Sequence, residues 1–321
     1  MCDVRHAITK MQGWACGLAL SGALVLGLAP AAQAASAPGA YTSYASEVTA
    51  TTAKLKGSVN PHGQGTNYYF EYGTTSKYGA VTPLSPAGNA TQGVSVSTTV
   101  TGLAALTTYH YRIVTENASG VVPGGDRTFT TAKIPLTFAL SLPPLDVYGS
   151  PLTVSGVLSG TGAPDHAVVL QENPFPYVTG FKTVGNPELT DANGHFAFPG
   201  VTLLSNTQLR VSTLDKTPVL SRVVLEPVAV RVTLHVKASG AGFARFYGTV
   251  MPGSGLARVS FQLVGRGRLP HTLASIVIDS RGAATHFSRR VRIRHAGLYR
   301  AYVQVASGEL TSGHSRPLRI G

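Results

Sequence analysis

Short runs in which apolar and polar residues alternate recur along the chain from residue 41 onward, and each run has the length of a β-strand. Glycine, proline, asparagine and aspartate separate the runs, as turn residues do between strands. No segment after residue 41 shows the apolar period of about 3.6 residues that a helix requires. The pattern therefore predicts an all-β protein, built as a tandem array of three β-sandwich domains after a signal peptide.

The first stretch, residues 41–132, contains the most specific motif of the chain. Leu103 precedes Tyr109 by six residues, and Tyr109 lies in an alternating apolar run. This spacing is typical of a tyrosine corner, in which the ring packs into the core and the hydroxyl bonds to backbone upstream. We therefore expect a buried Tyr109 whose hydroxyl is bonded near residues 103–106.

The residues around this corner carry a resemblance to a known family. The supporting runs are Ala53–Pro61, Tyr69–Thr75 and Phe129–Thr131. Together with the Tyr109 strand, they make the stretch similar to a fibronectin type III domain of the kind found in secreted bacterial proteins. The resemblance implies an antiparallel sandwich that acts as a binding or spacing domain rather than as a catalyst.

Residues 136–228 and 229–321 are predicted to be a diverged pair. Short matching runs recur at a spacing of about 90 residues, which suits one immunoglobulin-like sandwich per unit. The matched runs are Gly156–Leu158 with Gly248–Val250, Val168–Gln171 with Val259–Gln262, Asp191–Gly194 with Asp279–Gly282, Leu209–Val211 with Tyr299–Ala301, and Ser221–Arg222 with Ser315–Arg316. Both units resemble bacterial immunoglobulin-like domains.

Residues 1–34 have the features of a secretory signal peptide. Arg5 and Lys10 precede an apolar run at 14–29, and residues 32–34 fit a small-residue cleavage site. The run is shorter than a membrane span of about 20 residues, and no later apolar run reaches that length. We expect cleavage here and a secreted, extracellular protein without an integral membrane span.

No catalytic or metal-binding motif stands out. Cys2 and Cys16 both lie in the predicted signal, so the mature chain offers no thiol for disulfides or metal ligation. The zinc-protease, nucleophile-elbow, phosphate-loop and dinucleotide motifs are missing. Asp191–Gly194 is better explained as a hairpin turn than as a calcium loop, because the later ligands are lacking. We expect no enzyme activity, no cofactor and no metal; a hydrolase with a dispersed site is the alternative that the sequence leaves open.

Charge is distributed very unevenly along the chain. The formal net charge is +12, and the residues after 228 hold fourteen Lys and Arg against two Asp and Glu, so this last stretch accounts for the whole excess. All but one of these cations are arginines, whose planar fork matches phosphate and carboxylate groups. Two interpretations stay open: an anion-binding surface, or a solvated strand face in a protein with many arginines.

Part of this charge is predicted to be ordered as a site. Arginines alternate with two apolar residues, and if the apolar residues face the core, the arginines form an outward row. A turn at residues 295–297 would then bring one further arginine beside the row. The predicted anion-binding residues are Arg290, Arg292, Arg294 and Arg300.

These features predict a secreted, non-catalytic binding or spacer protein, held at the cell envelope by its basic domain, residues 229–321. The expected partners are anionic cell-envelope polymers or polysaccharide, with no specific nucleic acid, and we expect a monomer. The alternative is a carbohydrate-binding accessory protein of an extracellular polysaccharide-degrading system. Binding to soluble glycans that persists in high salt would favour that alternative.

Overall fold

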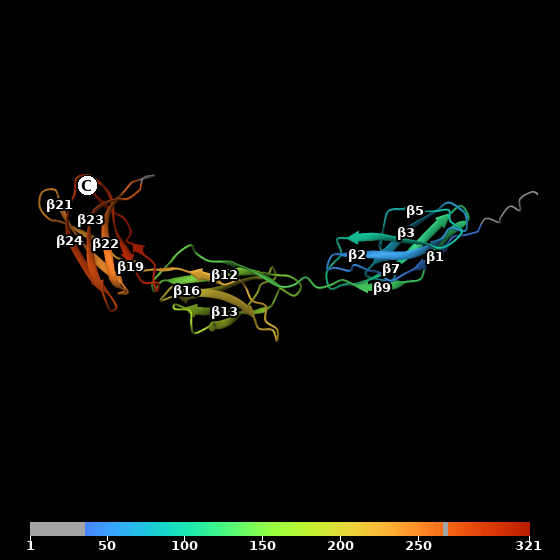
Figure 1. Cartoon of the computed structure of the whole chain (residues 1–321), viewed down its shortest axis with the longest axis horizontal. Helices are drawn as coiled ribbons and strands as arrows, with labels where there is room; N and C mark the ends of the chain where they lie inside the picture. The colour runs from blue at the N-terminus through green and yellow to red at the C-terminus, as the bar shows by residue number, and fades with distance from the viewer. Residues whose placement is uncertain (1–35, 266–268) are drawn as a thin grey trace, which may run out of the picture.

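The computed structural model describes residues 36–265 and 269–321, and every regular element in these residues is a β-strand (Figure 1). The prediction of an all-β protein is therefore confirmed. The predicted signal peptide, residues 1–34, lies outside the described residues. In the described part of the chain there is no helix long and apolar enough to span a membrane. The strands form pairs of sheets that follow one another along the long axis of the molecule (Figure 1).

The first sandwich closes on a core rich in aromatic residues. Its strands are β1 (Gly39–Thr42), β2 (Thr52–Asn60), β3 (Thr66–Gly73), β4 (Ala80–Val81), β5 (Ser85–Gly88), β6 (Val94–Thr101), β7 (Thr108–Asn117), β8 (Gly120–Pro123) and β9 (Arg127–Thr130). One sheet has the order β1-β2-β6, and the other is centred on the β3–β7 pair. Strand alternation places Leu55, Phe70 and Tyr111 between the two sheets, where each is fully buried.

Tyr109 occupies a corner position in this sandwich. Its ring is 9% exposed and stacks on Phe129 with the ring centroids 5.6 Å apart. Its hydroxyl accepts a hydrogen bond from the backbone N–H of Ala104, at 2.9 Å, and Leu103 is buried beside it. A buried ring with its hydroxyl tied to upstream backbone is the arrangement of a tyrosine corner.

Two strands of the second sandwich were not predicted from the sequence. Its strands are β10 (Thr137–Ser141), β12 (Pro151–Ser159), β13 (Ala167–Pro174), β14 (Lys182–Leu189), β15 (His195–Thr202), β16 (Thr207–Thr213) and β17 (Val224–Glu226). They form the sheets β10-β12-β15 and β14-β13-β16-β17. These two strands, β10 and β14, lie at sheet edges. Strand β14 is mostly exposed and contains Gly185 and Pro187, so it lacks the buried alternation of its neighbours.

The third sandwich carries the basic charge. Its strands are β19 (Arg231–Val232), β20 (His235–Ala238), β21 (Phe243–Met251), β22 (Gly255–Val264), β23 (His271–Ser280), β24 (Thr285–Arg292), β25 (Gly297–Val305), β26 (Gly313–His314) and β27 (Leu318–Ile320). In one sheet, β21 lies between β20 and β24; in the other, β22 lies between β23 and β25. Phe246, Phe261 and Tyr299 fill the space between the sheets.

Matching hydrogen bonds recur in the second and third sandwiches at the positions that the sequence repeat pairs. The Nε of Arg210 donates to the side-chain oxygen of Gln171 at 2.8 Å, and the Nε of Arg300 donates to that of Gln262 at 2.9 Å. Each pair joins the two central strands of its sheet, β13 with β16 and β22 with β25. The two sandwiches can therefore be compared position by position.

The second and third sandwiches are joined by backbone pairing and by a shared core. Strand β11 (Asp146–Val147) pairs in parallel with β18 (Val228–Ala229) at their junction. The side chain of Asn206 donates to the carbonyl oxygen of Gly308 at 2.8 Å and accepts from the N–H of Val228 at 2.8 Å. One apolar cluster runs through both sandwiches, whereas the first sandwich has a core of its own.

Candidate anion-binding face of the third sandwich

The outer face of the β20-β21-β24 sheet presents its side chains in rows across the three strands. Residues on one face of neighbouring antiparallel strands stand directly opposite each other, about 4.5–5.5 Å apart. The rows, in the order β20 (or the residues just before it), β21, β24, are Thr233–Thr249–His286, His235–Tyr247–Ser288 and Lys237–Arg245–Arg290. A polar row, a row with two rings and a cationic row therefore follow one another on one surface.

The cationic row, called here the cation row, consists of Lys237, Arg245 and Arg290. Arg245 is directly opposite Lys237 on one side and Arg290 on the other, and all three side chains are exposed. Like charges directly opposite each other destabilise a sheet. The row therefore costs stability unless an anion binds to it.

No carboxylate within the third sandwich compensates the cation row. The stretch contains only Asp279 and Glu309 as acidic residues. Asp279 is paired with Arg281 at 2.9 Å, and Glu309 lies at the junction with the second sandwich, where its carbonyl oxygen accepts from Asn206. Among the described residues, none of the ion pairs includes a member of the cation row.

Contacts within the sheet hold Arg290 in place. Its Nη2 donates to the carbonyl oxygen of Ser239 at 3.0 Å, and its guanidinium lies 4.3 Å from the ring centroid of Phe243. A cation above an aromatic ring is attracted by the ring's electron-rich face. The guanidinium is therefore positioned before any ligand arrives, so less side-chain entropy would be lost on binding.

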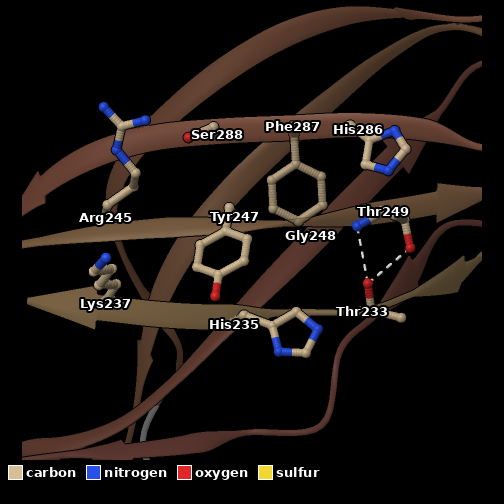
Figure 2. A pocket seen from close by; sticks show the side chains of 10 residues that line it. All are labelled: Thr233, His235, Lys237, Arg245, Tyr247, Gly248, Thr249, His286, Phe287 and Ser288. Carbon is tan, nitrogen blue, oxygen red and sulfur yellow. Dashed lines mark hydrogen bonds between the residues drawn. The ribbon is translucent and has the colours of Figure 1, made fainter.

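His235 and Tyr247 form an aromatic pair beside the cation row. Their ring centroids are 5.4 Å apart with 27° between the ring planes, and Tyr247 is 41% exposed. Figure 2 shows the two rings side by side, with Lys237 and Arg245 next to them. These residues line a shallow depression of about 590 Å³ that ends at Thr249 and His286.

A glycine allows the strands to pack closely beneath this depression. A Cβ atom on Gly248 would lie 2.1 Å from the carbonyl oxygen of Thr233, so no other residue fits there without a backbone shift. The Thr233 hydroxyl is in turn within 2.7 Å of the Thr249 hydroxyl and accepts from the Thr249 N–H, as the dashed lines of Figure 2 show. The floor of the depression is thus fixed by backbone geometry.

Three of the four arginines predicted as a site lie along β24 and just beyond its end. Arg290, Arg292 and Arg294 are exposed. Val291 is 3% exposed and Ile293 packs against the core, so the alternation orients the arginines outward as expected.

Arg300 lies elsewhere, so the expectation that a turn at residues 295–297 would bring it beside the other three does not hold. The chain crosses from β24 to β25 over this segment, and these strands belong to different sheets. The ring of Tyr299 fills the core, which turns Arg300 to the outer face of the opposite sheet, where Gln262 binds it. The local sequence predicted a turn but not a change of sheet.

A second depression, of about 440 Å³, opens between the two sheets next to the arginines. Arg289, Arg292 and Arg294 line it together with His271 and His295. Strand alternation would place Arg289 on the side of Val291, yet Arg289 is exposed because β24 is the last strand of its sheet. The basic surface therefore continues around this edge.

The sequence interpretation missed the cation row and the aromatic pair. Both depend on the pairing of β20 with β21 through the short connection at residues 239–242, which contains Gly240 and Gly242 with positive φ angles. A hairpin predicted from these glycines would have placed Lys237 opposite Arg245. The glycines of this turn are visible in the sequence, but the alternation within β24 alone could not show which strands pair.

In the described part of the chain, no three His, Cys, Asp or Glu side chains come together as a metal ion would require. No protein-family model and no curated protein sequence matches the chain. Solved structures similar to it include the FN1–FN3 domains of chicken CNTN1, at 12% identity and a TM-score of 0.28, covering 88% of this chain and 97% of that one.

Two further solved structures show similarity over most of the chain. A tetra-tandem repeat in the extending region of a large adhesion protein is 13% identical, with a TM-score of 0.32, and the match covers 88% of this chain and 75% of that one. A marsupial T cell receptor is 12% identical, with a TM-score of 0.28, and the match covers 86% of this chain and 96% of that one. Identities this low say nothing of ligand or activity.

Proposed function

We propose that this is a secreted, non-catalytic binding protein whose third sandwich holds it on anionic polymers of a cell envelope, while the other sandwiches act as spacers or present a contact surface. The observation that carries the proposal is the cation row, in which Arg245 stands directly opposite Lys237 on one side and Arg290 on the other, without a carboxylate. An anionic ligand would relieve their mutual repulsion, because it supplies the missing opposite charge.

A polymer suits this surface better than a single small anion. Exposed charge pairs contribute only about 0–1 kcal/mol each, so several must act together. The basic surface extends from the cation row to Arg292 and Arg294 around the edge of β24. A chain with regularly repeated charges can contact many of these cations at once, and each further contact is then intramolecular.

The first test is the salt dependence of binding to anionic polymers. The full secreted chain is expected to bind immobilised polyuronate or polyphosphate at low ionic strength. It should release polyphosphate well below about 1 M salt, where the Debye length has fallen from about 10 Å at 0.1 M to about 3 Å. Absence of binding to any anionic polymer at low ionic strength would overturn the proposal.

Two triple variants with the same loss of charge separate an organised face from diffuse charge. Replacing Lys237, Arg245 and Arg290 by Gln is expected to weaken binding by at least roughly tenfold, equivalent to about 1.4 kcal/mol. The control replaces three arginines on the opposite sheet by Gln: Arg258, Arg300 and Arg319. The control should lose less than about threefold, and equal losses in both variants would mean that no organised site exists.

A further inference from the structure

The second and third sandwiches provide an internal comparison for the outer face. Gly156 pairs with Phe196 in the second, as Gly248 pairs with Phe287 in the third. A Cβ on either glycine would meet a backbone carbonyl oxygen, at 2.4 Å and 2.1 Å respectively, and also the ring of the paired phenylalanine. These two glycines therefore mark the same position in the two folds.

The face around Gly156 has the same strand pairing but different chemistry. It carries a depression of about 540 Å³, close in size to the one in the third sandwich. The row that holds the aromatic pair in the third sandwich is Ser141–Ser155–Ala197 in the second. The second sandwich has no row that matches the cation row, because β10 ends at Ser141 and the pairing of β12 with β15 is interrupted by a bulge between Leu152 and Val154.

The second sandwich thus forms this face without the aromatic pair and without the cation row, and its depression is lined instead by His195 and its partner Asp191. Only His286 of the third sandwich has a like counterpart, His195, at the matching position. The rings and cations of the third sandwich lie outside its core, where Tyr247 and the cation row are exposed. Their presence therefore calls for an explanation other than folding, and a bound ligand supplies one.

The chemistry of the face selects among anionic polymers. An aromatic ring offers an apolar face, which packs on the C–H side of a pyranose ring, whereas a polyphosphate chain has no such side. The cations match carboxylates, and an arginine can hold a carboxylate through two parallel hydrogen bonds. The cations of the row follow one another across strands about 4.8 Å apart, close to the length of one pyranose ring.

We infer that this face binds a chain of acidic sugars, with pyranose rings stacked on His235 and Tyr247 and their carboxylates on Lys237, Arg245 and Arg290. This inference rests on the proposed function and narrows its ligand to carboxylated polysaccharides. It assigns the aromatic pair the stacking role and the cation row the charge-pairing role. It also predicts that binding to such a chain is only partly screened by salt, because stacking does not depend on charge.

The test compares a polymer that has rings and charges with a polymer that has charges alone. The probes are polygalacturonate, the same polymer with its carboxyl groups reduced, and polyphosphate. The variant replaces His235 and Tyr247 by Ser, the residue that the second sandwich carries at both matching positions, so the fold is expected to tolerate it. The control is Tyr302→Ala on the outer face of the opposite sheet. Thermal unfolding checks that both variants fold.

The double Ser variant is expected to bind polygalacturonate roughly tenfold more weakly and polyphosphate within about twofold of the unchanged chain. The variant in which Lys237, Arg245 and Arg290 are replaced by Gln should bind both polymers more weakly. Tyr302→Ala should bind both as tightly as the unchanged chain. The reduced polymer should bind more weakly than polygalacturonate at low ionic strength. At salt concentrations that release polyphosphate, the unchanged chain should still retain part of the polygalacturonate.

The outcomes separate this inference from the proposed function. If the affinity of the double Ser variant falls equally for both anionic polymers, or falls for neither, the stacking role is wrong while anion binding stands. If polyphosphate is bound as tightly as polygalacturonate at every salt concentration, the narrower ligand class is also wrong. If no anionic polymer is bound at low ionic strength, the proposed function itself fails.

Discussion

At the scale of single residues, the Tyr109 hydroxyl is a polar group whose removal has a defined cost. It accepts the Ala104 N–H at 2.9 Å at the edge of the core. Tyr109→Phe removes this acceptor and leaves the ring, so the free energy of unfolding of the first sandwich should fall by about 0.5–1.5 kcal/mol. Urea denaturation of the full chain measures this loss.

Tyr72→Phe is the matched control for that measurement. Tyr72 packs against the same core, and its hydroxyl has no hydrogen-bond partner among the described residues. This substitution should change the free energy of unfolding by less than about 0.5 kcal/mol. Equal effects of the two substitutions would show that the Tyr109 hydrogen bond adds nothing to stability.

Single residues could be predicted from sequence where the determining contact is local. Leu103 and Tyr109 lie six residues apart, and their spacing indicated the corner. Tyr299 follows Ile293 by the same spacing, and its buried ring places its hydroxyl on the carbonyl oxygen of His295. The same local signal was therefore present in the third sandwich, with isoleucine in the place of leucine.

At the scale of strands, the cation row predicts a conflict between binding and stability. Arg245 is directly opposite two cations, and such a like-charge pair costs about 0.2–1 kcal/mol. Arg245→Gln should therefore raise the free energy of unfolding of the third sandwich by about this amount at low ionic strength. The gain should shrink in high salt, because screening removes the repulsion.

Arg258→Gln is the control for this effect. Arg258 is exposed on the opposite sheet, and its cross-strand partners are Val277 and Gln304, which carry no charge. Its replacement should leave stability nearly unchanged at either salt concentration. A loss of stability in Arg245→Gln at low ionic strength would contradict the idea that the free face is electrostatically strained.

Strands could be predicted from the sequence where one side of the strand is buried. The strands that pair with them in the sheet could not. In β16, buried and outward residues alternate over the first five residues, which is the pattern from which a strand can be recognised. The edge strand β14 has no such pattern, and the positions of Arg300 and Arg245 depend on which sheet each strand joins. Such pairings are set by long-range packing that the local sequence does not contain.

At the scale of the whole molecule, two buried carboxyl groups lie at the junction of the second and third sandwiches. Glu226 is 2% exposed and Asp146 is 5% exposed, and one oxygen of each has no hydrogen-bond partner among the described residues. Burial, and secondarily the charge of Asp146, raises the pKa of Glu226 from about 4.5 to about 7. Burial also raises the pKa of Asp146, although Arg231 opposes this shift.

The last prediction is that this junction loosens as the pH rises. The folded chain holds the Glu226 proton more tightly than the unfolded chain does. The contribution of this group is therefore fully present below about pH 4.5 and is lost as the pH rises through about 7. The loss should reach at most roughly 3 kcal/mol, because one unit of pKa corresponds to about 1.4 kcal/mol.

Glu226→Gln should remove this part of the pH dependence and should make the chain more stable than the unchanged protein above neutral pH. Urea denaturation across this pH range measures the free energy of unfolding of both chains. The control is Glu309→Gln, which replaces an exposed carboxylate at the same junction and should leave the dependence of this free energy on pH unchanged. Parallel curves for the unchanged chain and Glu226→Gln would mean that folding does not raise the pKa of Glu226.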